Sequence, residues 1–183
     1  EWHIWDHLVQ DVDSSLPNFG IIKNHPELID INIGDFTNPN EGDWLHTNAI
    51  AYNSDLDQIV FSSKHFNEIF IIDHSTTVFE ASGHVGGNSN KGGDILYRWG
   101  NPDNYGRGDN SDQKLNAQHG VHWIPLGYLG AGKLLIFNNN PSDTLSNSNQ
   151  FGNSSVVEIL PPVNDDSNYF LTADSIFGPE EYD

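Results

Sequence analysis

The sequence predicts an all-β protein, specifically a β-propeller built of four-stranded antiparallel blades. Short apolar runs alternate with turn-forming residues along the chain, which is typical of antiparallel meanders. The order of these runs occurs twice, and in each copy a histidine stands at the start of one run, His46 in the first and His119 in the second. Repeated four-stranded meanders form the blades of propellers, whose loops gather around a central channel.

The first predicted unit covers residues 1–82. Residues 1–9 alternate large and polar side chains, as a half-buried strand does. Residues 10–42 are rich in Asp, Asn, Gly and Pro and predict a long loop with a short extended piece at 28–33. Four strands joined by tight turns are then predicted near 46–52, 58–63, 67–73 and 77–81.

The second predicted unit covers residues 94–172, after a Gly-rich stretch at 83–93. That stretch has no lysine followed by Ser or Thr and no helical pattern after it, so it predicts an exposed loop and not a phosphate-binding loop. The second unit is predicted to contain strands near 94–100, 119–125, 133–138, 154–160 and 168–172.

The whole chain, 1–183, is thus expected to be part of a single propeller domain, with about two blades and flanking strands. Since a ring needs at least four blades, the outer strands need cover. We therefore expect self-association or pairing with remaining blades of the same protein.

The composition excludes several classes of partner. Against 7 Lys+Arg stand 26 Asp+Glu, a formal net charge of −19, and such a field repels nucleic acid and anionic membranes. The absence of cysteine excludes disulfides and zinc–thiolate sites. The sequence contains no run of about 18 apolar residues, so it predicts no membrane span. Because the chain contains no methionine and starts with glutamate, we expect a processed chain or a fragment.

Several separated motifs carry a resemblance to a known family. They are DWLHTNAI at 43–50, GDILYRWGNP at 93–102, QHGVHWIP at 118–125, LLIFNNN at 134–140 and SSVVEILPP at 154–162. In these motifs, and over nearly its whole length, the chain resembles the arylsulfotransferase family. The resemblance implies a six-bladed propeller, secreted or periplasmic. It also implies transfer of a sulfuryl group from an aryl sulfate ester to a phenol without a nucleotide donor.

The resemblance also implies a site. In that family a histidine attacks sulfur to form a sulfohistidine, while other histidines, an asparagine and an arginine hold the sulfate oxygens. His46 and His119 match sulfate-binding histidines and are the candidate catalytic residues. The candidate substrate-binding residues are Asn48, His122 and Arg98.

Two departures from the family pattern bear on activity. Asp143 replaces the clamping arginine, a reversal of charge, unless Lys64, Arg98 or Arg107 substitutes for it. The resemblance also places the nucleophilic histidine beyond residue 183. This chain alone is therefore not expected to catalyse the complete reaction.

The residues leave alternatives open. His46 and His119 are also explained as residues at strand starts that hydrogen-bond neighbouring carbonyls. His122 lies three positions after His119, and on a strand this odd offset predicts opposite faces. No cofactor is expected, with calcium at Asp103, Asp109 and Asp112 as a weaker alternative whose spacing departs from the EF-hand pattern. The alternative function is a non-catalytic propeller module for binding or assembly.

Overall fold

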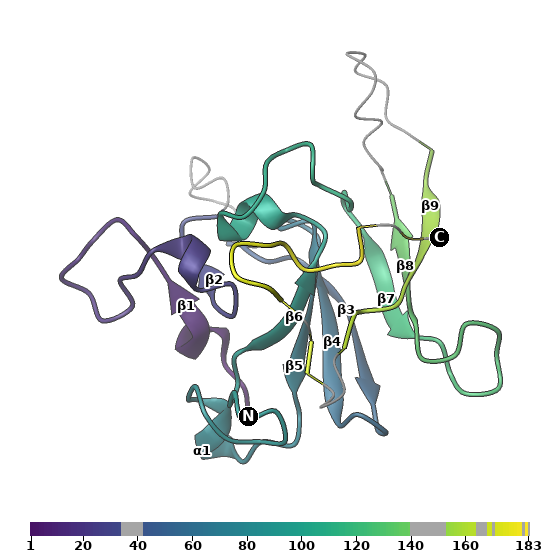
Figure 1. Ribbon diagram of the computed structural model, residues 1–183, viewed down its shortest axis with the longest axis horizontal. Helices are drawn as coiled ribbons and strands as arrows, with labels where there is room; N and C mark the ends of the chain where they lie inside the picture. The colour runs from purple at the N-terminus through teal and green to yellow at the C-terminus, as the bar shows by residue number, and fades with distance from the viewer. Residues whose placement is uncertain (34–41, 140–152, 164–167, 170, 181, 183) are drawn as a thin grey trace.

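The computed structural model describes residues 1–33, 42–139, 153–163, 168–169, 171–180 and 182. Within these ranges the regular structure consists of the strands β1 to β9, one short α-helix and three 3-10 turns. The prediction of an all-β protein is confirmed. The strands form a four-stranded sheet, a three-stranded sheet and a short two-stranded pair (Figure 1).

The four-stranded sheet contains its strands in chain order, each antiparallel to the next. They are β3 (Thr47–Asn53), β4 (Gln58–Ser63), β5 (Glu68–Asp73) and β6 (Ile95–Trp99). The strands predicted near 46–52, 58–63 and 67–73 are therefore confirmed. Every residue of β5 and β6 is buried, because protein covers both faces of this sheet.

The segment predicted as a strand at 77–81 is instead the helix α1 (Val78–Ala81). The reason is a capping box: the Thr77 hydroxyl accepts a hydrogen bond from the Glu80 backbone N–H at 3.3 Å. The Glu80 carboxylate in turn accepts one from the Thr77 N–H at 2.8 Å. This reciprocal pair satisfies N–H groups that a helix start leaves without partners, and it outweighs the β propensity of Thr77 and Val78.

The fourth strand of this sheet is β6, which the sequence assigned to the start of the second unit. It pairs with β5, with Phe70 opposite Arg98 and Ile69 opposite Trp99. The first sheet thus ends at Trp99, and the Gly-rich stretch at 83–93 is a long connection inside it. The sequence did not predict this pairing, because α1 and the Gly-rich stretch separate β5 from β6 along the chain.

The three-stranded sheet contains β7 (His119–Trp123), β8 (Leu134–Asn138) and β9 (Ser155–Ile159), again antiparallel and in chain order. These agree with the strands predicted near 119–125, 133–138 and 154–160. No strand forms among the described residues of 168–172, where Tyr169 makes an isolated bridge to Val163.

The N-terminal segment departs from the strand predicted at 1–9. Ile4–His7 form the 3-10 turn η1, and only Leu8–Val9 form a strand, β1. β1 pairs in parallel with β2 (Ile29–Asp30), which confirms the extended piece expected at 28–33. Two further 3-10 turns are η2 (Ile22–Asn24) and η3 (Pro102–Tyr105). The turn at η1 directs the His7 ring into the protein, where it is fully buried.

Two apolar cores lie on the two faces of the first sheet. One face packs against the second sheet, with Val60, Ile69 and Ile71 in the same cluster as Val121 and Ile136. The other face packs against the N-terminal segment. The C-terminal segment runs across both sheets in Figure 1 (yellow). It is fixed there because Tyr97 Oη donates to the Gly178 carbonyl at 2.6 Å and Trp99 Nε1 to the Pro179 carbonyl at 2.9 Å.

Candidate functional site

His46 lies directly before β3, in a left-handed backbone conformation with φ of 48°. The Asp43 carboxylate holds it twice, accepting from the His46 backbone N–H at 3.1 Å and contacting ring atom Nδ1. The hydrogen bond from His46 lowers the pKa of the Asp43 carboxyl below its ordinary value, so this group is an anion at neutral pH. Because Nδ1 is engaged, the second ring nitrogen, Nε2, is the one available to a ligand.

The turn between β4 and β5 lies against the same segment. The Lys64 backbone N–H donates to the His46 carbonyl at 3.2 Å, and His65 Nδ1 donates to the Asp43 carbonyl at 2.7 Å. The rings of His46 and His65 have centroids 4.9 Å apart. Sequence reasoning treated 64–66 only as a turn. The antiparallel pairing of β3 with β4 was the signal that places this turn beside the start of β3.

His119 occupies the equivalent place in the second sheet, as the first residue of β7. Its Nδ1 lies 2.9 Å from the Ala117 carbonyl oxygen and 2.7 Å from Nδ2 of Asn139. Asn139 follows β8 directly and also donates to the Ala117 carbonyl at 2.5 Å. The ring is half-buried. Asn139 belongs to the motif LLIFNNN at 134–140. Its contact with His119 was not predicted, because it depends on the pairing of β7 with β8.

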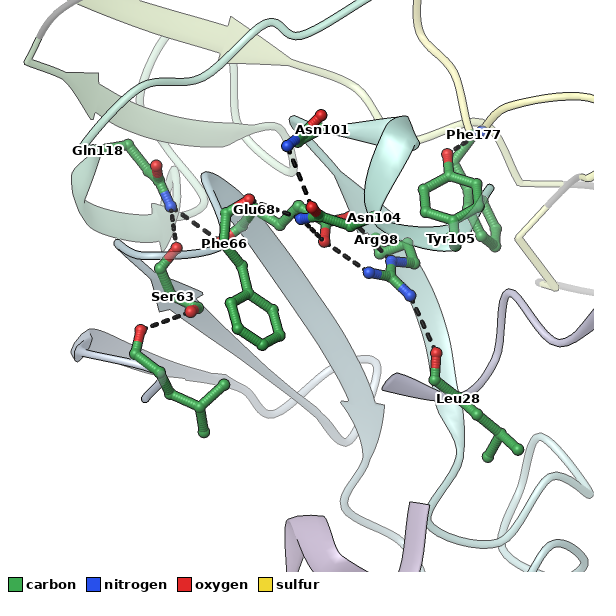
Figure 2. A network of polar contacts seen from close by, with 11 residues as sticks. Leu28, Ser63, Phe66, Glu68, Arg98, Asn101, Asn104, Tyr105, Gln118 and Phe177 are labelled. Carbon is green, nitrogen blue, oxygen red and sulfur yellow. Dashed lines mark hydrogen bonds and ion pairs between the residues drawn. The ribbon is translucent and has the colours of Figure 1, made fainter. Parts of the chain in front are cut away.

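The starts of β3 and β7 are joined directly. Asn48 Nδ2 donates to the Gln118 carbonyl at 2.8 Å. The buried Gln118 side chain reaches into the first sheet, where its amide donates to the carbonyls of Ser63 and Glu68, both at 2.9 Å. Figure 2 shows Gln118 directed at Ser63, and Ser63 is the residue paired with Thr47 at the start of β3. The two histidine-bearing strand starts therefore lie at the same end of neighbouring sheets.

Both strands begin with a β-bulge. In β3, Thr47 pairs with Ser63 and Ala49 with Ser62, so Asn48 is the extra residue. Bulges are common beside functional sites because they re-aim a side chain. The Asn48 amide oxygen is buried and has no hydrogen-bond partner among the described residues.

The bulge in β7 corrects one expectation. His119 pairs with Phe137 and His122 pairs with Leu135. Phe137 and Leu135 are two positions apart and share a face of β8, so His119 and His122 share a face of β7. An odd offset on a regular strand predicts opposite faces, but the extra residue in the bulge brings His119 and His122 to the same face. His122 is exposed, with Nδ1 2.8 Å from the Gly120 carbonyl oxygen.

Residues 2–159 match the arylsulfotransferase (ASST) family. The chain belongs to this family. The match includes His46 with the strand β3 that follows it, and His119 with its strand β7. The resemblance seen in the sequence motifs is confirmed. Comparisons with curated proteins and with solved structures gave no significant match.

Arg98 of this arylsulfotransferase-family chain does not lie at the histidine-bearing surface. Its side chain is fully buried, and it donates from Nε and Nη2 to Glu68 at 2.8 and 2.5 Å and from Nη1 to the Leu28 carbonyl at 3.0 Å (Figure 2). The rings of Phe70 and Tyr105 lie 5.2 and 4.6 Å from the guanidinium carbon. With its donors engaged inside the protein, Arg98 has a structural position, and its assignment to substrate binding stays a prediction.

Arg107 and Lys64 are the other two cations that the sequence offers as substitutes for the arginine of the family. Arg107 donates to the carbonyls of Lys23 and Ser175 at 2.7 and 3.2 Å, and so ties loops together. Lys64 is joined to His46 through its backbone, as described above. Asp143 lies outside the described residues.

The calcium alternative stays a prediction. Asp109 Oδ1 accepts from the Ser111 backbone and hydroxyl at 2.7 and 2.6 Å. Asp112 Oδ2 accepts from the Asp109 N–H at 2.9 Å. Both carboxylates thus have local hydrogen bonds of the kind that stabilise a turn. Asp103 begins η3.

Two clefts of about 300 Å³ lie at the other end of the sheets, beside the β3–β4 turn. Both contact Leu56, Gln58 and Tyr169. Since His46 precedes β3 and this turn follows it, these clefts are separated from the histidines by the length of the strand. No helix within the described ranges has the length and apolar character to cross a membrane.

Proposed function

We propose that this chain transfers a sulfuryl group from an aryl sulfate ester to a phenol at the shared start of β3 and β7. The observation that carries the proposal is the Asn48–Gln118 hydrogen bond at 2.8 Å, which joins the segments bearing His46 and His119. Membership of the arylsulfotransferase family supports the substrate class. The reaction needs a nucleophile and donors for the sulfate oxygens, and imidazole supplies both.

His119 is our candidate for the nucleophile. The proposal uses the tautomer in which Nδ1–H donates to the Ala117 carbonyl, at 2.9 Å, and Nε2 carries the lone pair. It requires the Asn139 amide, whose Nδ2 lies 2.7 Å from Nδ1, to turn its oxygen towards the ring. Nε2 then attacks sulfur, the N–S bond forms, and the S–O bond to the donor phenol breaks. In the second half, the acceptor oxygen attacks sulfur and the N–S bond breaks, while the acceptor's proton balances the proton taken up by the departing phenolate. The family resemblance places the nucleophile beyond residue 183, and the proposal instead assigns this role to His119, within the chain.

In the proposal His46 does not attack sulfur but donates a hydrogen bond to the sulfate. The Asp43 carboxylate accepts from Nδ1–H of His46, and Nε2–H of the same ring donates to a sulfate oxygen. His65 and Asn48 border the same segment and are further donors. Fixed donors stabilise the charge that builds on the sulfate oxygens in the transition state.

Lys64 is the candidate for the cation that an arginine supplies in the family. Its backbone N–H donates to the His46 carbonyl at 3.2 Å, which holds the Lys64 backbone beside the site, while Arg98 and Arg107 are engaged elsewhere. An ammonium binds sulfate as a point charge and not with the two-pronged geometry of a guanidinium. We therefore expect weaker orientation of the substrate than an arginine gives.

The arrangement of the sheets supports a propeller. Each sheet is a meander in chain order, their faces share a core, and their first strands, β3 and β7, are neighbours. This is how the inner strands of adjacent blades meet around a channel. We propose an exported location, secreted or periplasmic, from the family alone.

The test uses 4-nitrophenyl sulfate as donor and phenol as acceptor, with release of 4-nitrophenol measured by absorbance. We expect transfer by the wild type and loss of transfer in His119→Ala. Intact-mass measurement after donor alone is expected to show one added SO₃ group on the wild type and none on this variant.

His74→Ala is the matched control, because His74 is exposed and pairs with one carboxylate, Asp57, as His46 pairs with Asp43. It is expected to keep wild-type transfer. A folded wild type that neither turns over nor gains mass would contradict the proposal and favour the alternative of a non-catalytic binding module. Transfer that survives in His119→Ala would exclude His119 as the nucleophile.

A further inference from the structure

A second cluster of histidines lies away from the proposed sulfuryl-transfer site. It combines His7 from η1, His84 from the Gly-rich stretch and Asp94, which directly precedes β6. One ligand atom from each residue lies within 4.8 Å of the other two. His7 and Asp94 are buried, while 60% of the His84 side chain is exposed.

The hydrogen bonds of His7 fix the roles of its two nitrogens. Nε2 lies 2.9 Å from the Ala81 carbonyl oxygen and therefore carries a proton. In a neutral imidazole Nδ1 then has the lone pair, yet it faces Asp94 Oδ1 at 2.9 Å. Two acceptors at this distance need a proton or a cation between them.

A third group converges on the same atom. His84 Nδ1 lies 2.8 Å from Asp94 Oδ1, so one carboxylate oxygen faces two imidazole nitrogens. The link from His7 Nε2–H to a backbone carbonyl is the usual way in which a metal-binding histidine is oriented. Gly93 makes this link possible, because a Cβ there would lie 2.2 Å from the Ala81 oxygen and 2.6 Å from His7 Nε2.

We propose that His7, His84 and Asp94 bind one divalent transition-metal ion, with Zn²⁺ as the best fit. Two imidazole nitrogens and a carboxylate oxygen suit Zn²⁺, which takes such ligands at about 2.0–2.2 Å in a tetrahedral arrangement. These bond lengths put tetrahedral ligand atoms about 3.3 Å apart. The present contacts therefore open by about half an ångström when the ion binds. Movement of the exposed His84 opens its contact with Asp94, while the His7–Asp94 contact opens by a small rotation of the Asp94 carboxylate. The open side of His84 leaves the fourth position to water.

The metal joins three segments that are distant in sequence: the N-terminal turn, the Gly-rich stretch and the start of β6. Because the unfolded chain does not hold these ligands together, binding stabilises the folded state. The net charge of −19 attracts cations to the protein as a whole. This proposal does not depend on sulfuryl transfer.

The test is calorimetric titration of ZnCl₂ into the full chain after treatment with EDTA, together with thermal unfolding in Zn²⁺ and in EDTA. We expect one equivalent to bind and the midpoint of unfolding to rise in Zn²⁺. His84→Ala, which alters an exposed side chain, is expected to lower the affinity by more than about tenfold and to remove the rise. Co²⁺ is expected to give the visible absorption of a tetrahedral site in the wild type only.

Two control variants make the assignment specific. His74→Ala removes another exposed histidine, 52% exposed, and His65→Ala removes a member of the Asp43–His46–His65 cluster. Both are expected to bind Zn²⁺ as the wild type does. Absence of binding to the wild type would overturn the proposal and leave the His7–Asp94 contact as a buried hydrogen bond. Binding that is lost in His65→Ala and kept in His84→Ala would overturn it in favour of the other cluster.

Discussion

The guanidinium of Arg98 forms two parallel hydrogen bonds with the carboxylate of Glu68, and both side chains are fully buried. Nη1 of Arg98 also donates to the Leu28 carbonyl, and Asn104 Nδ2 donates to Glu68 Oε2 at 2.8 Å. This network holds the N-terminal segment and η3 against β5 and β6 (Figure 2).

Neutralising Glu68 is expected to destabilise the fold strongly. Glu68→Gln leaves the Arg98 cation buried without its counter-charge, and breaking a buried pair in this way costs about 3–5 kcal/mol in the free energy of unfolding. Urea denaturation followed by tryptophan fluorescence measures the loss.

Glu158→Gln is the matched control for Glu68→Gln. Its partner is Lys133, 2.5 Å away, and both side chains are about 30% exposed, so the expected loss is at most about 1 kcal/mol. Equal losses in the two variants would show that burial of the Arg98–Glu68 pair is not the deciding factor.

Gln118→Leu is expected to lower stability by about 1–3 kcal/mol, because buried carbonyls of Ser63 and Glu68 lose their donor. Leucine has a similar volume, so the loss reports the hydrogen bonds more than the packing. Chemical denaturation is the measurement. Stability equal to the wild type would contradict the role of Gln118 in joining the two sheets.

Asp43→Asn tests whether Asp43 positions His46 for the reaction. Asp43 acts through His46 as a positioning residue, so its loss is expected to reduce kcat/KM by less than His46→Ala, for which removal of one donor costs about 10²–10³ in kcat. Steady-state kinetics with 4-nitrophenyl sulfate are the measurement. A kcat/KM equal to that of the wild type would contradict the role of Asp43 in positioning His46.

Asp73 predicts a dependence of stability on acid pH. Burial raises the pKa of this carboxyl, but hydrogen bonds from the side chains and backbones of Ser75 and Ser89 outweigh burial, and the net pKa is lowered. A carboxyl with a lowered folded-state pKa stabilises the fold above its unfolded-state pKa of about 3.9. That contribution is lost as pH falls through the folded-state pKa.

The expected result is a loss of unfolding free energy below about pH 4 that is smaller in Asp73→Asn than in the wild type. Ser89→Ala removes one hydroxyl donor, 2.6 Å from Asp73 Oδ2, and should give an intermediate slope. Thermal unfolding across the acid range measures all three. Identical slopes would exclude Asp73 as a source of the acid sensitivity.

The strands of both sheets were predictable because their apolar runs lie between clear turn residues. α1 was missed because Thr77 and Val78 favour strands locally, whereas the capping contact of Glu80 decides the conformation. The place of β6 was missed because pairing across α1 and the Gly-rich stretch is a long-range property. Residues 1–9 were misread because the burial of His7 depends on Ala81 and Asp94.

The histidines of the candidate site were predictable from the motifs at 43–50 and 118–125. The residues that contact these histidines were not predictable. His65 reaches His46 only through the β3–β4 pairing, and the shared face of His119 and His122 depends on a bulge that no spacing rule reveals. Arg98 was assigned to the substrate because the sequence shows a charge but not its burial.

The cover on both faces of the first sheet determines where this chain tolerates change. β5 and β6 have no solvent-facing side chain, so a mutagenesis library is expected to return few accepted polar substitutions at any of their positions. The connection between β7 and β8 is expected to tolerate substitution, since Leu129 and Leu126 are 99% and 78% exposed. That connection is the natural place for an epitope tag or a fluorescent label, because an insertion there disturbs neither core.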